Sequence, residues 1–129
     1  MDYSSDTTWT NKSPLPENKY QQASTGNASY AWIGGGRTPS TTSSVTRLDY
    51  GNDTSSPAPK GPLSRTMDNV SATGNVSYGY FVDGGDSRVD RIDYSNDTAT
   101  ATPKGPLGAP MYTSYNNFGF SAAANALPQ

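Results

Sequence analysis

The chain has 129 residues and a formal net charge of −2, with 9 basic and 11 acidic residues and neither cysteine nor histidine. The few, scattered lysines and arginines exclude the basic face of a nucleic-acid-binding protein, and the lack of a run of 18 apolar residues excludes a membrane-spanning helix. Without histidine or cysteine, disulfides, thiolate metal sites and serine–histidine catalysis are excluded, so we predict no cofactor, metal site or catalytic residue.

Three units that each begin with Asp-Tyr divide the chain: 2–48, 49–92 and a truncated third unit, 93–129. The match is strongest after that dipeptide, where "GNDTSSPAPKGPL" in the second unit corresponds to "SNDTATATPKGPL" in the third. Self-similarity of this kind is typical of proteins in which each repeat is one supersecondary unit. We therefore interpret 1–129 as a single domain built of repeats.

In chain order, the units consist of short strands separated by turns. A Thr-rich segment such as "TTWTNKS" ends at Pro-Leu, and proline belongs at the edge or end of an outer strand. A polar strand ("KYQQAST"), a Gly-Asn turn, an aromatic strand closed by glycines ("SYAWIGGG") and an alternating strand ("VTRLDY") follow. No apolar period of 3.6 residues is present, so the sequence predicts an all-β fold with very little helix.

Large aliphatic residues are scarce, whereas the chain has nine tyrosines, two tryptophans and many small residues. The hydrophobic core is therefore expected to be thin. Stacking of repeats, closure of a ring or oligomerisation must supply further stability.

The order of these elements resembles the kelch repeat, whose glycine-closed strand precedes a strand ending in a Tyr-Asp-type turn, a Trp strand and a proline-marked return. Here that order is "AWIGGG", "VTRLDY" and "DYSSDTTWTNKSPLPENKY", with Trp9 at the place of the kelch tryptophan. Ser55 and Ala99 replace this tryptophan in the later units, and "FSAAAN" replaces the glycines of the third unit. The resemblance implies kelch-like β-propeller blades of four antiparallel strands, about three per chain.

The expected strands do not complete a ring. Residues 19–58 and 66–102 would each form a blade, 7–13 would supply only an outer strand, and 111–124 only two inner strands. Known propellers have about four to eight blades. We therefore expect oligomerisation to close the ring by pairing the leftover strands of different chains. A homodimer with about six blades is favoured, and a trimer is the alternative.

A narrower resemblance concerns "VDRIDYSNDTATATPKGPL", which is similar to repeats of predicted kelch-like structural proteins of marine bacteriophages, especially viruses of cyanobacteria. It implies a non-enzymatic virion structural protein that decorates a capsid or tail, lies at the virion surface and contacts other virion proteins. One alternative is a receptor-binding or glycan-binding module of a tail fibre that contacts a host surface glycan. Another is a carbohydrate-active enzyme on a propeller scaffold.

Four aromatic residues fall at equivalent strand positions and form the candidate binding set: Tyr30, Trp32, Tyr78 and Tyr80. Aromatic rings dominate burial in thin cores, so the favoured interpretation is packing between blades. Stacking on a glycan or another partner is the alternative. Phe118 and Phe120 occupy the same positions in the third unit.

Aspartates recur at positions i and i+4 of each turn, as Asp49 and Asp53, as Asp93 and Asp97, and as Asp2 and Asp6. Aspartate side chains accept hydrogen bonds from nearby backbone N–H groups, so the favoured role is a structural turn. A calcium site is the alternative, although the spacing lacks the dense oxygen ligands of a dedicated calcium loop.

A second group of carboxylates, Asp83, Asp86, Asp90 and Asp93, lies close in sequence to arginines. Carboxylates held about 5–10 Å apart can hydrolyse glycosides. In an alternating strand, however, such charges ordinarily form cross-strand pairs, and this is the interpretation we favour.

Overall fold

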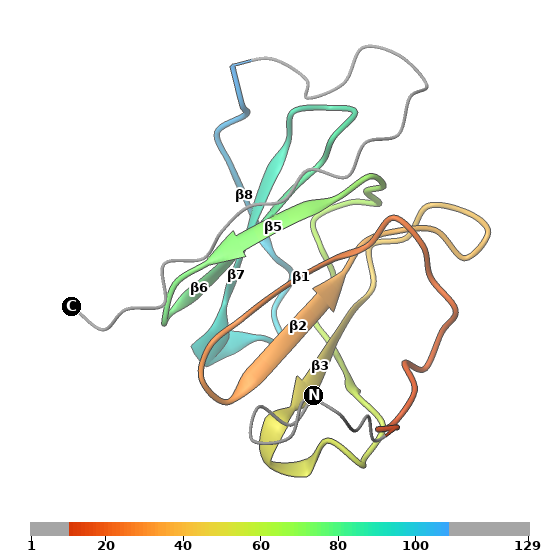
Figure 1. Cartoon of the computed structure of the whole chain (residues 1–129). Helices are drawn as coiled ribbons and strands as arrows, with labels where there is room; N and C mark the ends of the chain where they lie inside the picture. Colours follow the sequence, from red (N-terminus) through yellow and green to blue (C-terminus); the bar gives the residue numbers. More distant parts are fainter. Residues whose placement is uncertain (1–10, 109–129) are drawn as a thin grey trace, which may run out of the picture.

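The computed structural model describes residues 11–108, which form two four-stranded antiparallel sheets (Figure 1). In each sheet the spatial order of the strands follows their order in the chain. From here on, the word repeat means one such sheet with its turns, which differs from the sequence units that begin at Asp-Tyr. The first sheet contains β1 (Ala23–Gly26), β2 (Tyr30–Gly34), β3 (Val45–Asp49) and β4 (Ala58–Lys60), and the second contains β5 (Ser71–Gly74), β6 (Tyr78–Val82), β7 (Val89–Asp93) and β8 (Thr102–Lys104). The only helical segments in this part of the chain are two single 3₁₀ turns, η1 (Tyr50–Asn52) and η2 (Tyr94–Asn96).

The predicted all-β fold with very little helix is confirmed, and the two sheets correspond to the two complete strand sets predicted in 19–58 and 66–102. The outer strands are a correction, because β4 and β8 begin at the last residue of those ranges and extend two residues beyond them. Residues 11–108 contain two such sheets and no closed ring. The strands expected in 111–124, and most of the outer strand expected in 7–13, lie outside the described residues. Residues 11–13 themselves have no strand assignment, which corrects that end of the prediction.

The outer strands β4 and β8 are shorter than their Thr-rich sequences suggested, and each contains a proline. Pro59 and Pro103 stand at the centre of these three-residue strands, opposite Thr46 of β3 and Asp90 of β7. Proline has no N–H to donate, and an outer strand is the place in a sheet where one side of the ladder can remain unpaired. Each sheet therefore ends at a proline-bearing edge strand.

Asparagines form the turns between the first two strands of each sheet. Asn27 Oδ1 accepts hydrogen bonds from the N–H groups of Ser29 (2.9 Å) and Tyr30 (3.0 Å). Asn75 makes the same two bonds with Ser77 and Tyr78, each at 2.9 Å. A short amide side chain that reaches the backbone two or three residues ahead is the expected basis of such a turn.

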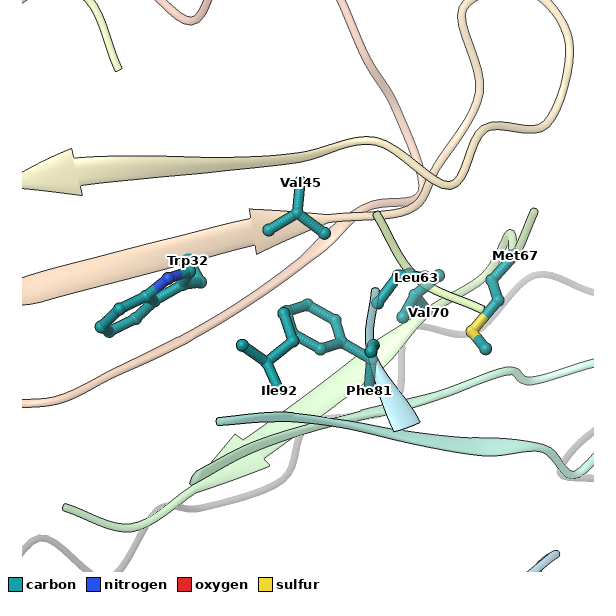
Figure 2. Close-up of a cluster of buried hydrophobic side chains, with 8 residues drawn as sticks. Trp32, Val45, Leu63, Met67, Val70, Phe81 and Ile92 are labelled. Carbon is teal, nitrogen blue, oxygen red and sulfur yellow. The ribbon is translucent and has the colours of Figure 1, made fainter. Parts of the chain in front are cut away.

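The two sheets lie face to face, with β1 beside β5 (Figure 1). Because side chains alternate along a strand, Trp32 and Val45 share the face of the first sheet that meets the second. Phe81 and Ile92 project from the second sheet toward them, as Figure 2 shows. Gly34 has no side chain, and a Cβ atom at this position would lie only 3.0 Å from the Phe81 ring.

The core between the sheets is small and contains two large aromatic residues. Trp32 is 1% exposed and Phe81 is fully buried. Smaller contributions come from the loop between β4 and β5, which supplies Leu63 and Met67 (Figure 2). The remaining core residues are Val45, Val70, Ile92 and Ala101. The expectation of a thin core supplemented by stacking agrees with this arrangement.

Gly61 makes the closest backbone approach between the two repeats, since a Cβ atom there would collide with the Ala99 carbonyl oxygen and lie 2.7 Å from the Thr98 carbonyl carbon. Gly105 occupies the same position in the next repeat, and no atom of the described residues lies within 4 Å of its Cβ position. We expect Gly61→Ala to lower the free energy of unfolding by about 2 kcal/mol, as overpacking does.

The matched variant Gly105→Ala is expected to change the free energy of unfolding by less than about 0.5 kcal/mol. Urea titrations of both variants at low protein concentration, followed by circular dichroism, measure the difference. Equal effects of the two substitutions would contradict the close approach at Gly61.

Candidate functional site at the junction of the two sheets

A buried carboxylate, that of Asp97, joins the two sheets. Asp97 follows η2 of the second repeat, and the residue is 7% exposed. The Trp32 indole N–H and the Arg47 guanidinium each donate a hydrogen bond to Asp97 Oδ2 at 2.9 Å. Lys60 Nζ lies 3.2 Å from Oδ1. One carboxylate of the second repeat is therefore held by three side chains of the first.

Strand register brings these three donors together. Trp32 of β2 pairs with Arg47 of β3, and Val45, two residues before Arg47, pairs with Lys60 of β4. Directly paired residues and their i+2 neighbours project from the same face of a sheet. The three side chains therefore form a row across three adjacent strands, and we call this row the carboxylate clamp.

Aromatic stacking reinforces the junction. The Trp32 ring stacks on Tyr94 of the second repeat, with ring centroids 4.0 Å apart and 12° between the planes. Its other neighbour is Tyr30, in an edge-to-face contact at 5.8 Å. The Tyr94 hydroxyl lies 3.0 Å from Thr25 Oγ1 of β1, and burial raises the pKa of Tyr94. Arg47 lies over the Tyr30 ring at 4.2 Å, which is a cation–π geometry.

The four candidate binding aromatics are thus in two environments. Trp32 stacks on Tyr94, donates its N–H to Asp97 and is 1% exposed, so its ring is not open to a sugar. Tyr30 is half-buried beside it. Tyr78 and Tyr80 are half-buried on the far face of the second sheet, where Arg91 lies over the Tyr78 ring at 4.3 Å.

The paired turn aspartates have different roles at their two positions. Asp49 Oδ1 accepts from the Gly51 N–H at 2.8 Å, and Asp93 Oδ1 accepts from the Ser95 N–H at 2.9 Å. Asp53 and Asp97 instead form ion pairs with the preceding repeat, Asp53 through Lys12 at 3.3 Å. In the described part of the chain, no three acidic residues are grouped closely enough to hold a metal ion.

The other candidate carboxylates are held separately. Asp90 is fully buried and accepts hydrogen bonds from the N–H and hydroxyl of Ser64, which fixes the loop after β4 to β7. Asp86 forms ion pairs with Arg65 at 2.8 Å and Arg88 at 4.0 Å on the surface. Asp83 accepts from the Gly85 N–H at 3.0 Å.

The clamp cations were not identified as partners of Asp97 by sequence reasoning. The available signal was their repetition, since Lys12, Lys60 and Lys104 recur before "SPL" or "GPL". Arg47 and Arg91 recur two residues before an Asp-Tyr dipeptide. Repetition shows which positions are equivalent, but it does not show that the donors act on the next repeat rather than on their own.

Two aspartates are expected to affect stability with opposite dependence on pH. Burial raises the pKa of Asp83 above its ordinary value of 3.8, whereas hydrogen bonds from Ser95 lower that of Asp93. A carboxyl group whose pKa is raised on folding contributes stability that is lost as the pH rises through its folded-state pKa. A carboxyl group whose pKa is lowered on folding contributes stability that is lost as the pH falls through its folded-state pKa. At pH 7 we therefore expect Asp83→Asn to stabilise the fold and Asp93→Asn to destabilise it.

The Asp83 difference should shrink as the pH is lowered to the ordinary aspartate value, about 4. The Asp93 difference should begin to shrink below that value and be lost once the pH falls below the lowered pKa of Asp93. Urea unfolding of the three proteins at pH 7 and pH 3 measures the trend. An Asp83→Asn protein that is less stable than wild type at pH 7 would contradict the assignment, as would differences independent of pH.

Comparison with known proteins does not assign the chain to a family: no protein-family model and no curated protein matches it. Between residues 11 and 108, no helix has the length and apolar character needed to cross a membrane.

Proposed function

We propose that this chain is a non-enzymatic structural protein of a virus particle, in which stacked kelch-like sheets decorate the capsid or tail surface. The observation that carries the proposal is the Asp97 junction, where charged and aromatic side chains join one repeat to the next. Residues that could otherwise bind or transform a ligand are here used to hold sheets together. A chain with this pattern is suited to building a stable surface.

The geometry of the carboxylates supports a non-enzymatic role. A glycosidase needs two carboxyl groups that face a common substrate. Asp83, Asp86 and Asp90 instead have their own backbone or side-chain partners. We therefore do not propose the carbohydrate-active enzyme.

The proposed surface role includes self-association, with a homodimer favoured over a trimer, and contact with other virion proteins. The placement on a virus particle depends on the likeness of "VDRIDYSNDTATATPKGPL" to repeats of predicted phage proteins.

The placement can be tested with an antiserum raised against the recombinant chain. Immunogold labelling and mass spectrometry of particles purified from the source of the sequence should detect the protein on intact particles. Detection only in the particle-free fraction would overturn the proposal. A particle protein of similar abundance serves as the positive control.

A glycan-binding module is the second candidate, and the exposure of Tyr78 and Tyr80 favours it. These rings are half-buried on the far face of the second sheet, beside Arg91. A glycan array with wild-type protein and Tyr80→Ala tests it. Binding that the substitution abolishes would support this candidate over a purely structural surface.

A further inference from the structure

The far face of the second sheet carries a second copy of the carboxylate clamp. Tyr80 pairs with Arg91, and Val89, two residues before Arg91, pairs with Lys104. This register matches that of Trp32, Arg47 and Lys60 in the first sheet. Tyr80, Arg91 and Lys104 therefore form a row across three adjacent strands, which we call the distal clamp.

The distal clamp differs from the first clamp in its surroundings. Lys60, the equivalent of Lys104, has a side chain that is only 13% exposed because Asp97 and its turn cover it. Lys104 is exposed, and within 11–108 neither Lys104 nor Arg91 forms an ion pair, although the charge of Arg91 contributes to the lowered pKa of Asp93. Arg91 retains the cation–π contact with Tyr78 that corresponds to the contact of Arg47 with Tyr30. The donors are thus arranged as in the filled clamp, without its carboxylate.

The backbone beside the distal clamp is open in the same way. At Gly61, the Ala99 and Thr98 backbone of the next repeat fills the space around the missing Cβ. At Gly105, the equivalent position, no atom of residues 11–108 lies within 4 Å. Within the described residues, no segment therefore occupies on the second sheet the place that the Asp97 turn occupies on the first.

The sequence contains a further segment that matches these turns, and we call it the Asp6 turn from that match alone. Asp2-Tyr3-Ser4-Ser5-Asp6 matches the turn segments that begin at Asp49 and Asp93, so Asp6 corresponds to Asp53 and Asp97. Asp6 lies outside the described residues, and its sequence match is the argument for it.

The other two members of this set already have partners. Asp97 is enclosed by the first clamp, and Asp53 pairs with Lys12 while its carbonyl oxygen accepts from the Ser13 N–H at 3.1 Å. The Asp97 carbonyl oxygen and the Gly61 N–H make the same backbone bond at 2.8 Å. Binding of Asp53 to a distal clamp would therefore require Lys104 to displace Lys12.

We propose that the distal clamp, formed by Tyr80, Arg91 and Lys104, binds the Asp6 turn of a second copy of this chain. Charge complementarity supports this occupant, since two cations on one face meet a carboxylate whose equivalents bind such cations within the chain. The inference deepens the self-association in the proposed function and rests on it. The contact is heterologous, because the clamp and the turn are different surfaces, so successive copies form a closed ring or an open filament.

The face of the first sheet that points away from the second sheet is also only partly covered. Phe81 and Ile92, which face the first sheet, are 0% and 2% exposed. Their equivalents in the first sheet, Ile33 and Leu48, are only half-buried. Both outer faces of the stack therefore have less cover than the inner junction, as expected for units that stack further.

Sedimentation velocity over a concentration series tests the proposal with the full chain. Wild type should self-associate, and Lys104→Gln and Asp6→Asn should each raise the dissociation constant at least about tenfold, because each removes one side of a charge pair. Arg65→Gln is the matched control, because it removes an exposed surface ion pair and should leave association unchanged. Circular dichroism verifies that each variant is folded.

A charge-exchange experiment tests whether Lys104 pairs specifically with Asp6 of another copy. Lys104→Asp and Asp6→Lys should each fail to associate alone, whereas an equimolar mixture should associate, because every contact in the mixture again joins opposite charges.

Any one of four results would overturn the proposal. The first two are a wild-type chain that remains monomeric to about 100 µM, and Lys104→Gln and Asp6→Asn variants that associate as wild type does. The other two are a charge-exchanged mixture that fails to recover association, and loss of association in Asp53→Asn but not in Asp6→Asn. Glycan binding through Tyr80 by a monomeric chain would also overturn it. A monomer found on virus particles would contradict this inference alone. An oligomer absent from particles would contradict the proposed function alone.

Discussion

Replacing Asp97 with asparagine is expected to lower the free energy of unfolding by about 3 kcal/mol. The carboxylate is 7% exposed and neutralises Arg47 and Lys60, whose side chains are themselves 27% and 13% exposed. Removal of its charge leaves two cations together in a partly buried site, and this repulsion costs more than the lost attraction alone. The substitution should therefore separate the two sheets more readily than any surface change.

The equivalent aspartate of the preceding repeat provides the control. Asp53 is 35% exposed and its partner Lys12 is 49% exposed, so Asp53→Asn should cost less than about 1 kcal/mol. Chemical unfolding of the two variants and wild type at pH 7 gives both values. If the two substitutions had equal effects, Asp97 would be an ordinary surface residue rather than the link between repeats.

Trp32→Ala is expected to have the largest effect, about 4 kcal/mol, because it removes a fully buried aromatic side chain. The ring is 1% exposed, stacks on Tyr94 and donates to Asp97, so three kinds of contact are lost together. An effect of this size can exceed the stability of a small domain. Trp32→Phe is therefore the more informative variant, with an expected cost of about 2 kcal/mol from the lost hydrogen bond to a charged group and the smaller ring.

Tyr80→Phe is the matched control, because Tyr80 is the repeat equivalent of Trp32 and is half-buried on the distal face. We expect it to change stability by less than about 0.5 kcal/mol at low protein concentration. Unfolding curves of Trp32→Phe, Asp97→Asn and the double variant also measure their coupling. Fully additive effects would contradict the hydrogen bond between the two side chains.

Local features of the sequence were sufficient to predict the strands and turns. The alternation in "VTRLDY" and "RVDRIDY" predicted β3 and β7, and asparagine and aspartate predicted the turns at Asn27, Asn75, η1 and η2. These features act within a few residues, and side-chain capping and alternation are visible in a single sequence. The outer strands were predicted less accurately, since β4 and β8 begin at Ala58 and Thr102, where the predicted blades end.

The candidate site could be predicted only in part. The sequence grouped Trp32 with Tyr80 as equivalents, yet Trp32 is enclosed while Tyr80 is half-buried. Their local sequences are alike, so within residues 11–108 the difference comes from the second sheet, which stacks on the Trp32 face and has no counterpart on the Tyr80 face. Burial by a neighbouring repeat is a property of the stack and not of the repeat itself.

The amino-acid sequence by itself determined the repeat, the all-β class, the turns and the absence of cysteine and histidine chemistry, because these follow from composition and from interactions between near neighbours in the chain. Only the tertiary structure decided that Asp97 binds Trp32, Arg47 and Lys60, residues that are 65, 50 and 37 positions earlier. That contact depends on strand register and on which faces of the two sheets meet. The meeting faces are held by the packing of Trp32 against Tyr94 and of Phe81 against Gly34, which no local pattern specifies.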